Sequence, residues 1–123
     1  MIAPAAAAVE PCRRYKPGMA RSTLDTDEIT QRLTALSGWT QQDGKLHREY
    51  RFADFVEAFG FMASVALVAE RLNHHPEWSN VWNTVVVDLI THDAGGITAK
   101  DFELANAMDR VAHSRGPRGL RTQ

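Results

Sequence analysis

Apolar residues near the start of the folded region recur at the spacing of an α-helix. Asp25 can cap this helix, with Glu28 three residues on as the second half of a capping box. Leu24 and Ile29 are placed to form the matching hydrophobic staple. One apolar face then follows at helical spacing: Ile29, Leu33 and Leu36. Gly38 ends the pattern, so we predict a first helix between Asp25 and Gly38.

Four further segments have the composition of β-strands: Trp39–Gln42, Lys45–Phe52, Ser79–Trp82 and Thr84–Thr91. The first two flank Asp43-Gly44, which is a strong signal for a two-residue hairpin turn. The last, TVVVDLIT, is rich in β-branched residues and typical of a central strand. The third segment pairs with it if the chain turns around Asn83. Such short hairpins predict an antiparallel sheet.

Two longer helices complete the pattern. The first spans Ala53 to Asn73. The second begins at Thr98, where Asp101 occupies the reciprocal capping position and Ile97 and Phe102 form the staple. The order of elements is therefore α-ββ-α-ββ-α. We predict an α+β fold, a two-layer sandwich in which a four-stranded antiparallel sheet carries helices on one face.

The helix over Ala53–Asn73 is apolar around most of its circumference. One stripe, which we expect to face the core, consists of Phe55, Phe59, Met62, Ala66 and Ala69. A second stripe consists of Phe61, Val65, Val68 and Leu72. A helix that covers one side of a sheet needs only one apolar face. We therefore predict that the chain self-associates through this helix; the alternative is that its two neighbouring helices cover it.

Composition fits one globular domain and excludes several classes of function. The chain has 123 residues, 44% apolar and 24% charged, with 14 basic against 15 acidic residues and a net charge of −1. That balance argues against partners such as duplex nucleic acid or an acidic membrane surface. No apolar run reaches the roughly 18 residues of a membrane-spanning helix. A single cysteine, Cys12, excludes an internal disulfide framework, and we expect a cytoplasmic protein.

Both ends of the chain differ from this domain in composition. Residues 1–22 carry three prolines and an alanine run without periodicity, and residues 114–123 are rich in Arg, Gly and Pro. We expect flexible tails at both ends of a domain that spans residues 23–113. A signal peptide is the alternative for the first tail, but the run Ala5–Val9 is too short and nothing basic precedes it. Met19 is a candidate for the true start.

The candidate chemistry lies in histidines at the ends of predicted elements. His74 and His75 leave the end of the long helix, because Pro76 disfavours helical geometry at the residue before it. His92 follows the β-branched strand and precedes Asp93 in a loop that enters the last helix. A helix end and a strand end can meet at a cleft. On spacing alone, three interpretations stay open: a zinc or iron site, acid/base catalysis, or surface histidines without a function.

The segment Ala69–Trp78, AERLNHHPEW, resembles the signature of the pterin-4a-carbinolamine dehydratase family. Further similar positions and segments are Gly38-Trp39, Ala58–Leu67, Trp82, Thr91-His92 and Asp101. The resemblance covers about Asp25 to His113 and implies a four-stranded antiparallel sheet with helices on one side, in dimers or tetramers. It implies a lyase that removes water from 4a-hydroxytetrahydrobiopterin to give quinonoid dihydropterin, which recycles the cofactor of aromatic amino-acid hydroxylases.

The resemblance also implies the residues of the site, with no metal and no cofactor, since the pterin is the substrate. Loss of the 4a-hydroxyl needs a proton donor for the leaving oxygen and an acceptor for the N5 proton, and histidine suits both roles near neutral pH. His74 and His92 would flank the C4a–N5 region, and His75 would position or relay. The substrate would be lined by Asn73, His74, His75, Pro76, Ile90, Thr91, His92, Asp93 and Trp39.

Supporting positions have two interpretations each. Glu70 lies one helical turn before His74 and could orient that ring, or it is a solvated helix charge. Asp101 matches a family position near the site, yet its capping role explains it as well. The tryptophans could stack on the pterin, although core packing suits at least two of them: Trp39, Trp78 and Trp82.

Two positions depart from the family's pattern. The family often has an acidic residue where Asn73 stands and a small hydroxyl where Ile90 stands, which bears on fine substrate contacts and not on the reaction type. Animal members also act as dimerisation cofactors for a homeodomain transcription factor. A non-catalytic accessory protein with the same fold is therefore the alternative function, although three intact histidines favour an enzyme.

Overall fold

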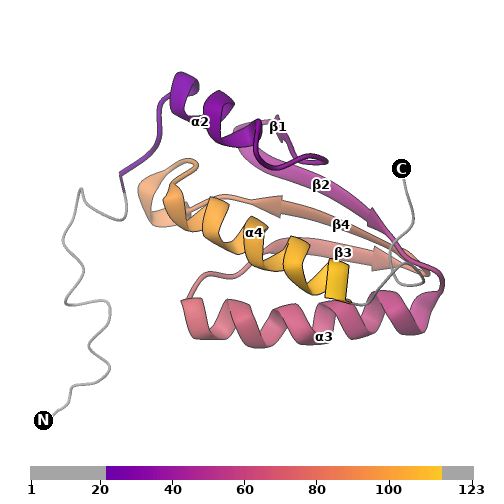
Figure 1. Ribbon diagram of the computed structural model, residues 1–123. Coiled ribbons are helices and arrows are strands. Elements are labelled where there is room, and N and C mark those ends of the chain that lie inside the picture. The colour runs from indigo at the N-terminus through magenta and orange to yellow at the C-terminus, as the bar shows by residue number, and fades with distance from the viewer. Residues whose placement is uncertain (1–21, 115–123) are drawn as a thin grey trace, which may run out of the picture.

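The computed structural model describes residues 22–114, and within them a four-stranded sheet and three α-helices form two layers (Figure 1). The elements are α2 (Thr26–Leu33), β1 (Thr40–Gln42), β2 (Lys45–Arg51), α3 (Phe55–Leu72), β3 (Glu77–Val81), β4 (Thr84–Leu89), the short 3-10 helix η1 (His92–Ala94) and α4 (Ala99–Ser114). The predicted α+β fold and its order of elements are confirmed. Most of the two predicted tails, residues 1–21 and 115–123, lies outside the described residues.

The sheet is antiparallel throughout, with strand order β1-β2-β4-β3. The β1–β2 hairpin turns at Asp43-Gly44, where both residues have positive φ, as the sequence predicted. The β3–β4 hairpin turns at Trp82-Asn83. β3 begins at Glu77, two residues earlier than predicted, because Trp78 already pairs with Val87. β4 ends two residues earlier than predicted, at Leu89.

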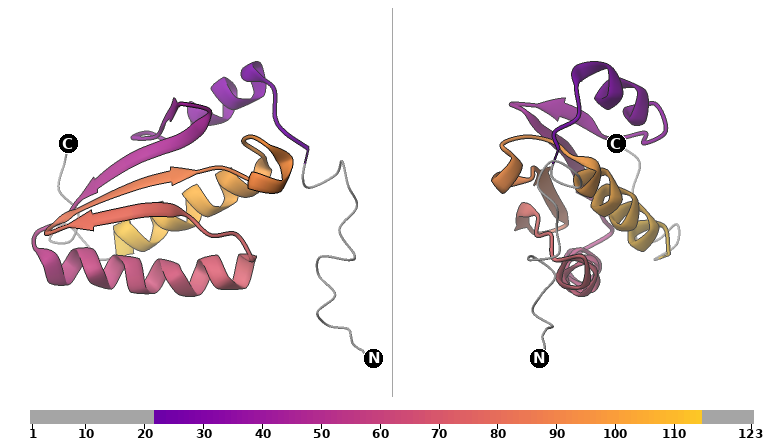
Figure 2. Two further views of the ribbon diagram at one scale, coloured as in Figure 1. Left: turned by 180° about the vertical axis from the view of Figure 1, so that it is seen from behind. Right: turned by 90° about the vertical axis from the view of Figure 1, so that its left-hand side faces the viewer.

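Alternate residues of the strands face the helices. The buried positions of β2 and β4 are Leu46, Tyr50, Val85, Val87 and Leu89. Figure 2 shows, in its end-on view, that α3 and α4 lie on one side of the sheet. The intervening positions carry polar groups on the other face, among them Lys45, His47, Glu49, Glu77 and Asp88. The buried side of the sheet is therefore apolar, and the other side is mostly polar, as suits a two-layer fold.

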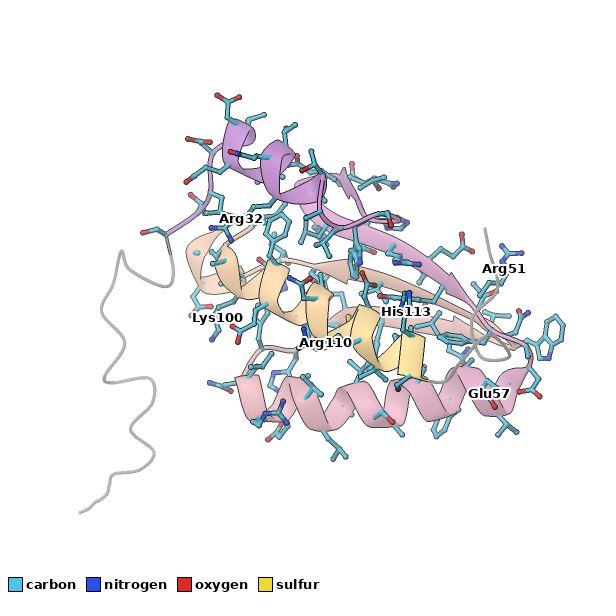
Figure 3. All side chains as sticks on the ribbon, viewed as in Figure 1. Arg32, Arg51, Glu57, Lys100, Arg110 and His113 are labelled. Carbon is cyan, nitrogen blue, oxygen red and sulfur yellow. The ribbon has the colours of Figure 1, made fainter. Side chains whose placement is uncertain are left out.

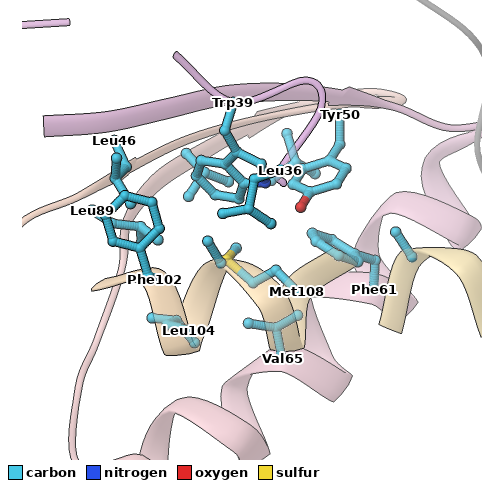
Figure 4. Close-up of a cluster of buried hydrophobic side chains, with 14 of the residues drawn as sticks. Leu36, Trp39, Leu46, Tyr50, Phe61, Val65, Leu89, Phe102, Leu104 and Met108 are labelled. Atoms are coloured by element: carbon cyan, nitrogen blue, oxygen red, sulfur yellow. The ribbon is translucent and has the colours of Figure 1, made fainter. Parts of the chain in front are cut away.

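The core lies between the sheet and the helices (Figure 4). Its largest fully buried side chains include Tyr50, Phe52, Phe61, Leu46, Leu89, Leu104 and Met108. The ring of Phe61, from α3, lies with its centroid 4.7 Å from that of Tyr50 and 4.9 Å from that of Phe52. These aromatic contacts fix α3 against β2 and the residue that follows it.

The structure corrects the predicted orientation of α3 in part. Its buried residues are Ala58, Phe61, Val65 and Ala69, so the side that faces the core combines members of both predicted stripes. Phe55 and Phe59, which we expected in the core, are about half exposed, at 48% and 57%. Both stripes are apolar, and packing against the sheet and α4 sets the rotation of the helix. Val56 and Leu67 are also exposed, which leaves an outward apolar surface on this helix.

A buried polar cluster joins α4 to the sheet around the carboxylate of Asp109. It accepts hydrogen bonds from the indole of Trp39, the guanidinium of Arg48 and the hydroxyl of Tyr50. Burial, followed by the charge of Asp109, raises the pKa of Tyr50 far above its usual value. Gly38 has φ +93, and a side chain there would meet Arg48. These bonds hold α4 against β2.

Candidate active site

The end of α3 turns the two neighbouring histidines in different directions. Asn73 adopts the left-handed conformation, with φ 55, which asparagine tolerates better than most residues. The backbone N–H of His74 donates to the carbonyl of Ala69 at 3.0 Å, and that of Asn73 donates to the carbonyl of Glu70 at 3.2 Å. This pair of bonds is the Schellman motif. The helix was predicted to end at Asn73 and ends one residue earlier, at Leu72, with Asn73 as its cap.

His74 points inward and joins a buried network around Asp101. Its Nε2 lies 2.6 Å from Oδ1 of Asp101, and both side chains are buried. The other oxygen of Asp101 accepts hydrogen bonds from the hydroxyl of Thr91 at 2.8 Å and from the backbone N–H of Thr98 at 2.9 Å. Asp101 therefore caps α4, as predicted, and at the same time ties the end of α3 to the end of β4.

His75 points outward and pairs with Glu70. Its Nε2 lies 2.9 Å from Oε1 of Glu70, and both side chains are exposed. The predicted contact between Glu70 and His74 is not formed, because the turn at Asn73 carries His74 away toward α4 and brings His75 back over the last turn of α3.

His92 begins the loop between β4 and α4. A bridge between Thr91 and Gly96 closes this loop, and Gly95 has the left-handed conformation that ends η1. His92 is exposed, and its Nε2 lies 2.7 Å from Oε2 of Glu77, the first residue of β3. The second oxygen of Glu77 lies 2.7 Å from Nζ of Lys45, the first residue of β2.

The pKa values of this group respond to the contacts. The hydrogen bond with Glu77 raises the pKa of Lys45 above its usual value. The hydrogen bonds from Lys45 and then from His92 lower the pKa of Glu77. Glu77 is therefore a carboxylate at neutral pH, an acceptor in both contacts.

These contacts bring the three predicted histidines to one end of the molecule. The end of α3, the start of β3, the end of β4 and the start of α4 meet there (Figure 1). Lys100 marks this end in Figure 3, whereas Arg51 and Glu57 mark the opposite one. The Nε2 atom of each histidine lies within hydrogen-bond distance of a carboxylate oxygen. An ionised carboxylate can only accept, so each Nε2 carries the proton and each neutral ring keeps its lone pair on Nδ1.

A family model described as pterin 4 alpha carbinolamine dehydratase matches residues 22–111. The chain belongs to this family. Two relatives, each named "Putative pterin-4-alpha-carbinolamine dehydratase", agree with the match. One, from Solibacter usitatus, is 61% identical over 89 residues, which are 72% of this chain and 94% of the relative. The other, from a Bradyrhizobium strain, is 56% identical over 93 residues, 74% of this chain and 94% of the relative.

The fold of this chain also matches that of a solved structure. It is titled "Crystal structure of transcriptional coactivator/pterin dehydratase from Brucella Melitensis". The TM-score is 0.72 and the sequence identity 45%, over 74% of this chain and 99% of that one. The family, the fold and the dehydratase class predicted from the sequence are confirmed by these comparisons.

The other residues that we expected to line the substrate differ in how far they are exposed. Asn73 and Asp93 are exposed, and Pro76 and Ile90 are partly buried. Thr91 is buried, with its hydroxyl committed to Thr98 and Asp101. The backbone of Thr91 also holds the loop, since its carbonyl accepts the N–H of Ala94 and of Gly95. These residues all lie at the histidine end of the sheet.

Two of the three tryptophans lie away from the histidines. Trp39 is 4% exposed, and its indole donates to Asp109, so it packs in the core. Trp82 is exposed at the tip of the β3–β4 hairpin, five residues beyond Glu77 and so roughly 16 Å away along the strand. Trp78 packs partly against the core. Within this chain the structure brings neither Trp39 nor Trp82 to the histidines.

Sequence reasoning missed Glu77, Lys45 and Thr98. Glu77 stands inside the signature segment, directly after Pro76, and its acidic side chain there was the available signal. Thr98 is a hydroxyl residue at a helix start, which is a recognised cap. Lys45 carried no signal, because only the pairing of β2 with β4 places it near β3.

Two features of residues 22–114 bear on a metal site and on a membrane location. No three histidine, cysteine, aspartate or glutamate side chains in this part of the chain are grouped as metal ligands. No helix within the same range combines the length and the apolar character needed to cross a membrane.

Proposed function

We propose that this protein is a 4a-hydroxytetrahydrobiopterin dehydratase that acts in tetrahydropterin recycling. The observation that carries the proposal is the group of three histidines at one end of the fold. The Nε2 atom of each ring is hydrogen-bonded to a different carboxylate. The family match and the dehydratase names of the relatives support the substrate class.

The reaction needs two proton transfers. One proton goes to the oxygen on C4a, the C4a–O bond breaks, and water leaves. The proton on N5 is lost to a base, and a C4a=N5 double bond forms, so the net change is loss of one water. A histidine with Nε2–H held by a carboxylate offers Nδ1 as the base when neutral and as the acid when protonated.

Exposure divides the roles among the histidines. The side chains of His75 and His92 are 59% and 73% exposed, whereas that of His74 is 9% exposed. We assign the two proton transfers to His75 and His92 and a positioning role to His74, which differs from our expectation that His74 and His92 flank the reacting bond. Asn73, Ile90 and Asp93 would border the pterin. No metal or cofactor takes part in this scheme.

The outward surface of α3 supports self-association. Phe55, Val56, Phe59 and Leu67 expose between 48% and 73% of their surface in one protomer. An exposed apolar patch of this kind is typical of a protein interface. We infer a homodimer or homotetramer that uses this helix, in the cytoplasm, as the near-neutral composition and single cysteine suggest.

A second candidate function uses the same helix. The Brucella structure is titled a transcriptional coactivator as well as a pterin dehydratase. The apolar surface of α3 is the observation that favours an accessory role, because it could bind another protein in place of a second copy. An accessory protein without catalysis would bind such a partner and leave the rate of water loss unchanged.

The experiment generates the 4a-hydroxytetrahydropterin, adds the purified protein and follows the quinonoid product by absorbance. The protein should accelerate product formation, and His75→Ala and His92→Ala should each remove most of the acceleration. His113→Ala is the matched control, since His113 lies near the end of α4, away from the cluster (Figure 3). A rate equal to the uncatalysed loss of water refutes the enzyme.

A further inference from the structure

The start of β3 holds a carboxylate between a cation and the most exposed of the three histidines. Glu77 reaches Lys45 with Oε1 and His92 with Oε2, both at 2.7 Å. We propose that Glu77, held by Lys45, is the positioning residue that determines which nitrogen of His92 carries the proton. This inference rests on the proposed dehydratase function.

The backbone fixes the carboxylate while leaving the histidine exposed. Glu77 pairs with Asp88 in the β3–β4 register, and β4 continues toward His92. Lys45 is on β2, the other neighbour of β4. The side chains of Lys45 on β2 and of His92 just beyond β4 thus both contact the carboxylate of Glu77 on β3. The side chain of His92 is 73% exposed, so little packing restrains its ring, and its bond to Glu77 is the contact that orients it.

The chemistry of the donors sets the position of the proton. The ammonium of Lys45 can only donate, so the oxygen facing it must accept. Glu77 has a lowered pKa and is ionised at neutral pH, so its other oxygen also only accepts. Nε2 of His92 therefore carries hydrogen, and Nδ1 is the atom free to exchange a proton with the pterin.

Glutamine at position 77 inverts this arrangement. Its amide has one accepting oxygen and one donating NH₂. Lys45 requires the oxygen, so the NH₂ faces His92, and Nε2 must accept. The proton of the neutral ring then moves to Nδ1. If Lys45 is also replaced by methionine, the amide can rotate, present its oxygen to His92 and restore the original tautomer.

The experiment compares wild type, Glu77→Gln, Lys45→Met and the double variant. The ring nitrogens of His92 are observed by ¹⁵N NMR at alkaline pH, in the range where its spectrum no longer changes with pH. Wild type and Lys45→Met should show Nε2–H, Glu77→Gln should show Nδ1–H, and the double variant should return to Nε2–H. Glu49→Gln is the control, on the same face of the sheet and in contact with Arg51.

The same variants are assayed for loss of water. Glu77→Gln should lower kcat by about 10- to 100-fold, the usual size for outer partners that orient metal-binding histidines, with KM changed less than about twofold. In the double variant, log kcat should rise by at least about a third of the amount by which Glu77→Gln lowers it. A merely structural role of Glu77 does not predict this recovery.

An unchanged His92 tautomer in Glu77→Gln overturns the proposal, whatever happens to the rate. So does a low kcat in Glu77→Gln that the second substitution fails to raise. If wild type itself does not accelerate loss of water, the proposed function fails, while the NMR comparison still decides whether Glu77 and Lys45 set the tautomer.

Discussion

Replacing Asp101 with alanine removes the carboxylate that joins α3, β4 and α4. In the folded protein this group accepts from His74 at 2.6 Å, from Thr91 at 2.8 Å and from the backbone of Thr98 at 2.9 Å, and it is fully buried. Alanine leaves these donors without that acceptor and removes the cap of α4. The hydroxyl of Thr91 keeps its contact with Thr98, so the loss at that group is small.

The size of the effect follows from these contacts. A buried donor left without a partner costs about 1–3 kcal/mol, and two such donors remain, Nε2–H of His74 and the backbone N–H of Thr98. We expect Asp101→Ala to lower the free energy of unfolding by about 3–5 kcal/mol. A domain of this size loses roughly 4–8 °C of Tm per kcal/mol, so Tm should fall by at least about 12 °C.

Thermal unfolding followed by circular dichroism measures this change. Glu103→Ala is the matched control, because Glu103 is an exposed acidic residue on the same helix, two positions away. Asp101→Asn separates stability from activity. Its oxygen must face the N–H of Thr98, so its NH₂ faces His74 and shifts the ring proton to Nδ1. We expect a smaller loss of Tm and a fall in kcat/KM of at least about tenfold. An alanine variant whose Tm lies within about 3 °C of the control refutes the reasoning.

Three further changes test other parts of the structure. Asp109→Ala should lower the free energy of unfolding by about 2–4 kcal/mol, because Trp39, Arg48 and Tyr50 lose their common acceptor. Urea unfolding with an unchanged m-value measures this loss, and a loss below about 0.5 kcal/mol contradicts the prediction. Burial raises the pKa of Tyr50 in the folded protein, so its hydroxyl loses its proton at a lower pH in the unfolded chain than in the folded one. The free energy of unfolding should therefore fall by about 1.4 kcal/mol per pH unit above pH ~10. Urea titrations between about pH 9 and 11 should show a shallower slope for Tyr50→Phe; an equal slope would mean that another group causes it. Phe59→Glu should weaken self-association, and light scattering should move toward the 13.7 kDa of one chain; a wild type that is already a monomer refutes the inferred assembly.

Local signals in the sequence predicted the fold well where one segment of chain decides the structure. The Asp25 and Glu28 capping box forms as expected, with the backbone of Glu28 donating to Asp25 at 2.8 Å. Asp43-Gly44 turns the first hairpin, and Asp101 caps the last helix. Each of these features depends on residues no more than four apart, so periodicity and turn chemistry were sufficient.

Contacts between distant elements were not predicted. The buried face of α3 was predicted only in part: Ala69 is buried as expected, whereas Phe61 is buried in place of Phe55, because the two rings are equally apolar and only packing distinguishes them. The carboxylate that each histidine contacts depends on the left-handed turn at Asn73 and on the pairing of β2 with β4. Trp39 was placed at the site because the family resemblance carried it there, whereas its hydrogen bond to Asp109, 70 residues away, holds it in the core.

The sequence placed the three histidines at the ends of predicted elements, and the fold gathers them at one end, but the contacts of each ring were not predicted. Sequence spacing put His74 and His75 at a helix terminus without showing that one is buried and the other exposed. The structure separates them and thereby changes the expected roles. It also adds Glu77 and Lys45, whose relation to His92 crosses three strands.

The central claim is that the histidine cluster removes water from a 4a-hydroxytetrahydropterin. The most direct test adds the purified protein to freshly generated 4a-hydroxytetrahydropterin and records the appearance of quinonoid dihydropterin by absorbance, alongside His92→Ala and His113→Ala. Our account predicts acceleration by wild type and by His113→Ala, and little by His92→Ala. A wild-type rate no faster than the spontaneous loss of water, or an undiminished rate in His92→Ala, contradicts it.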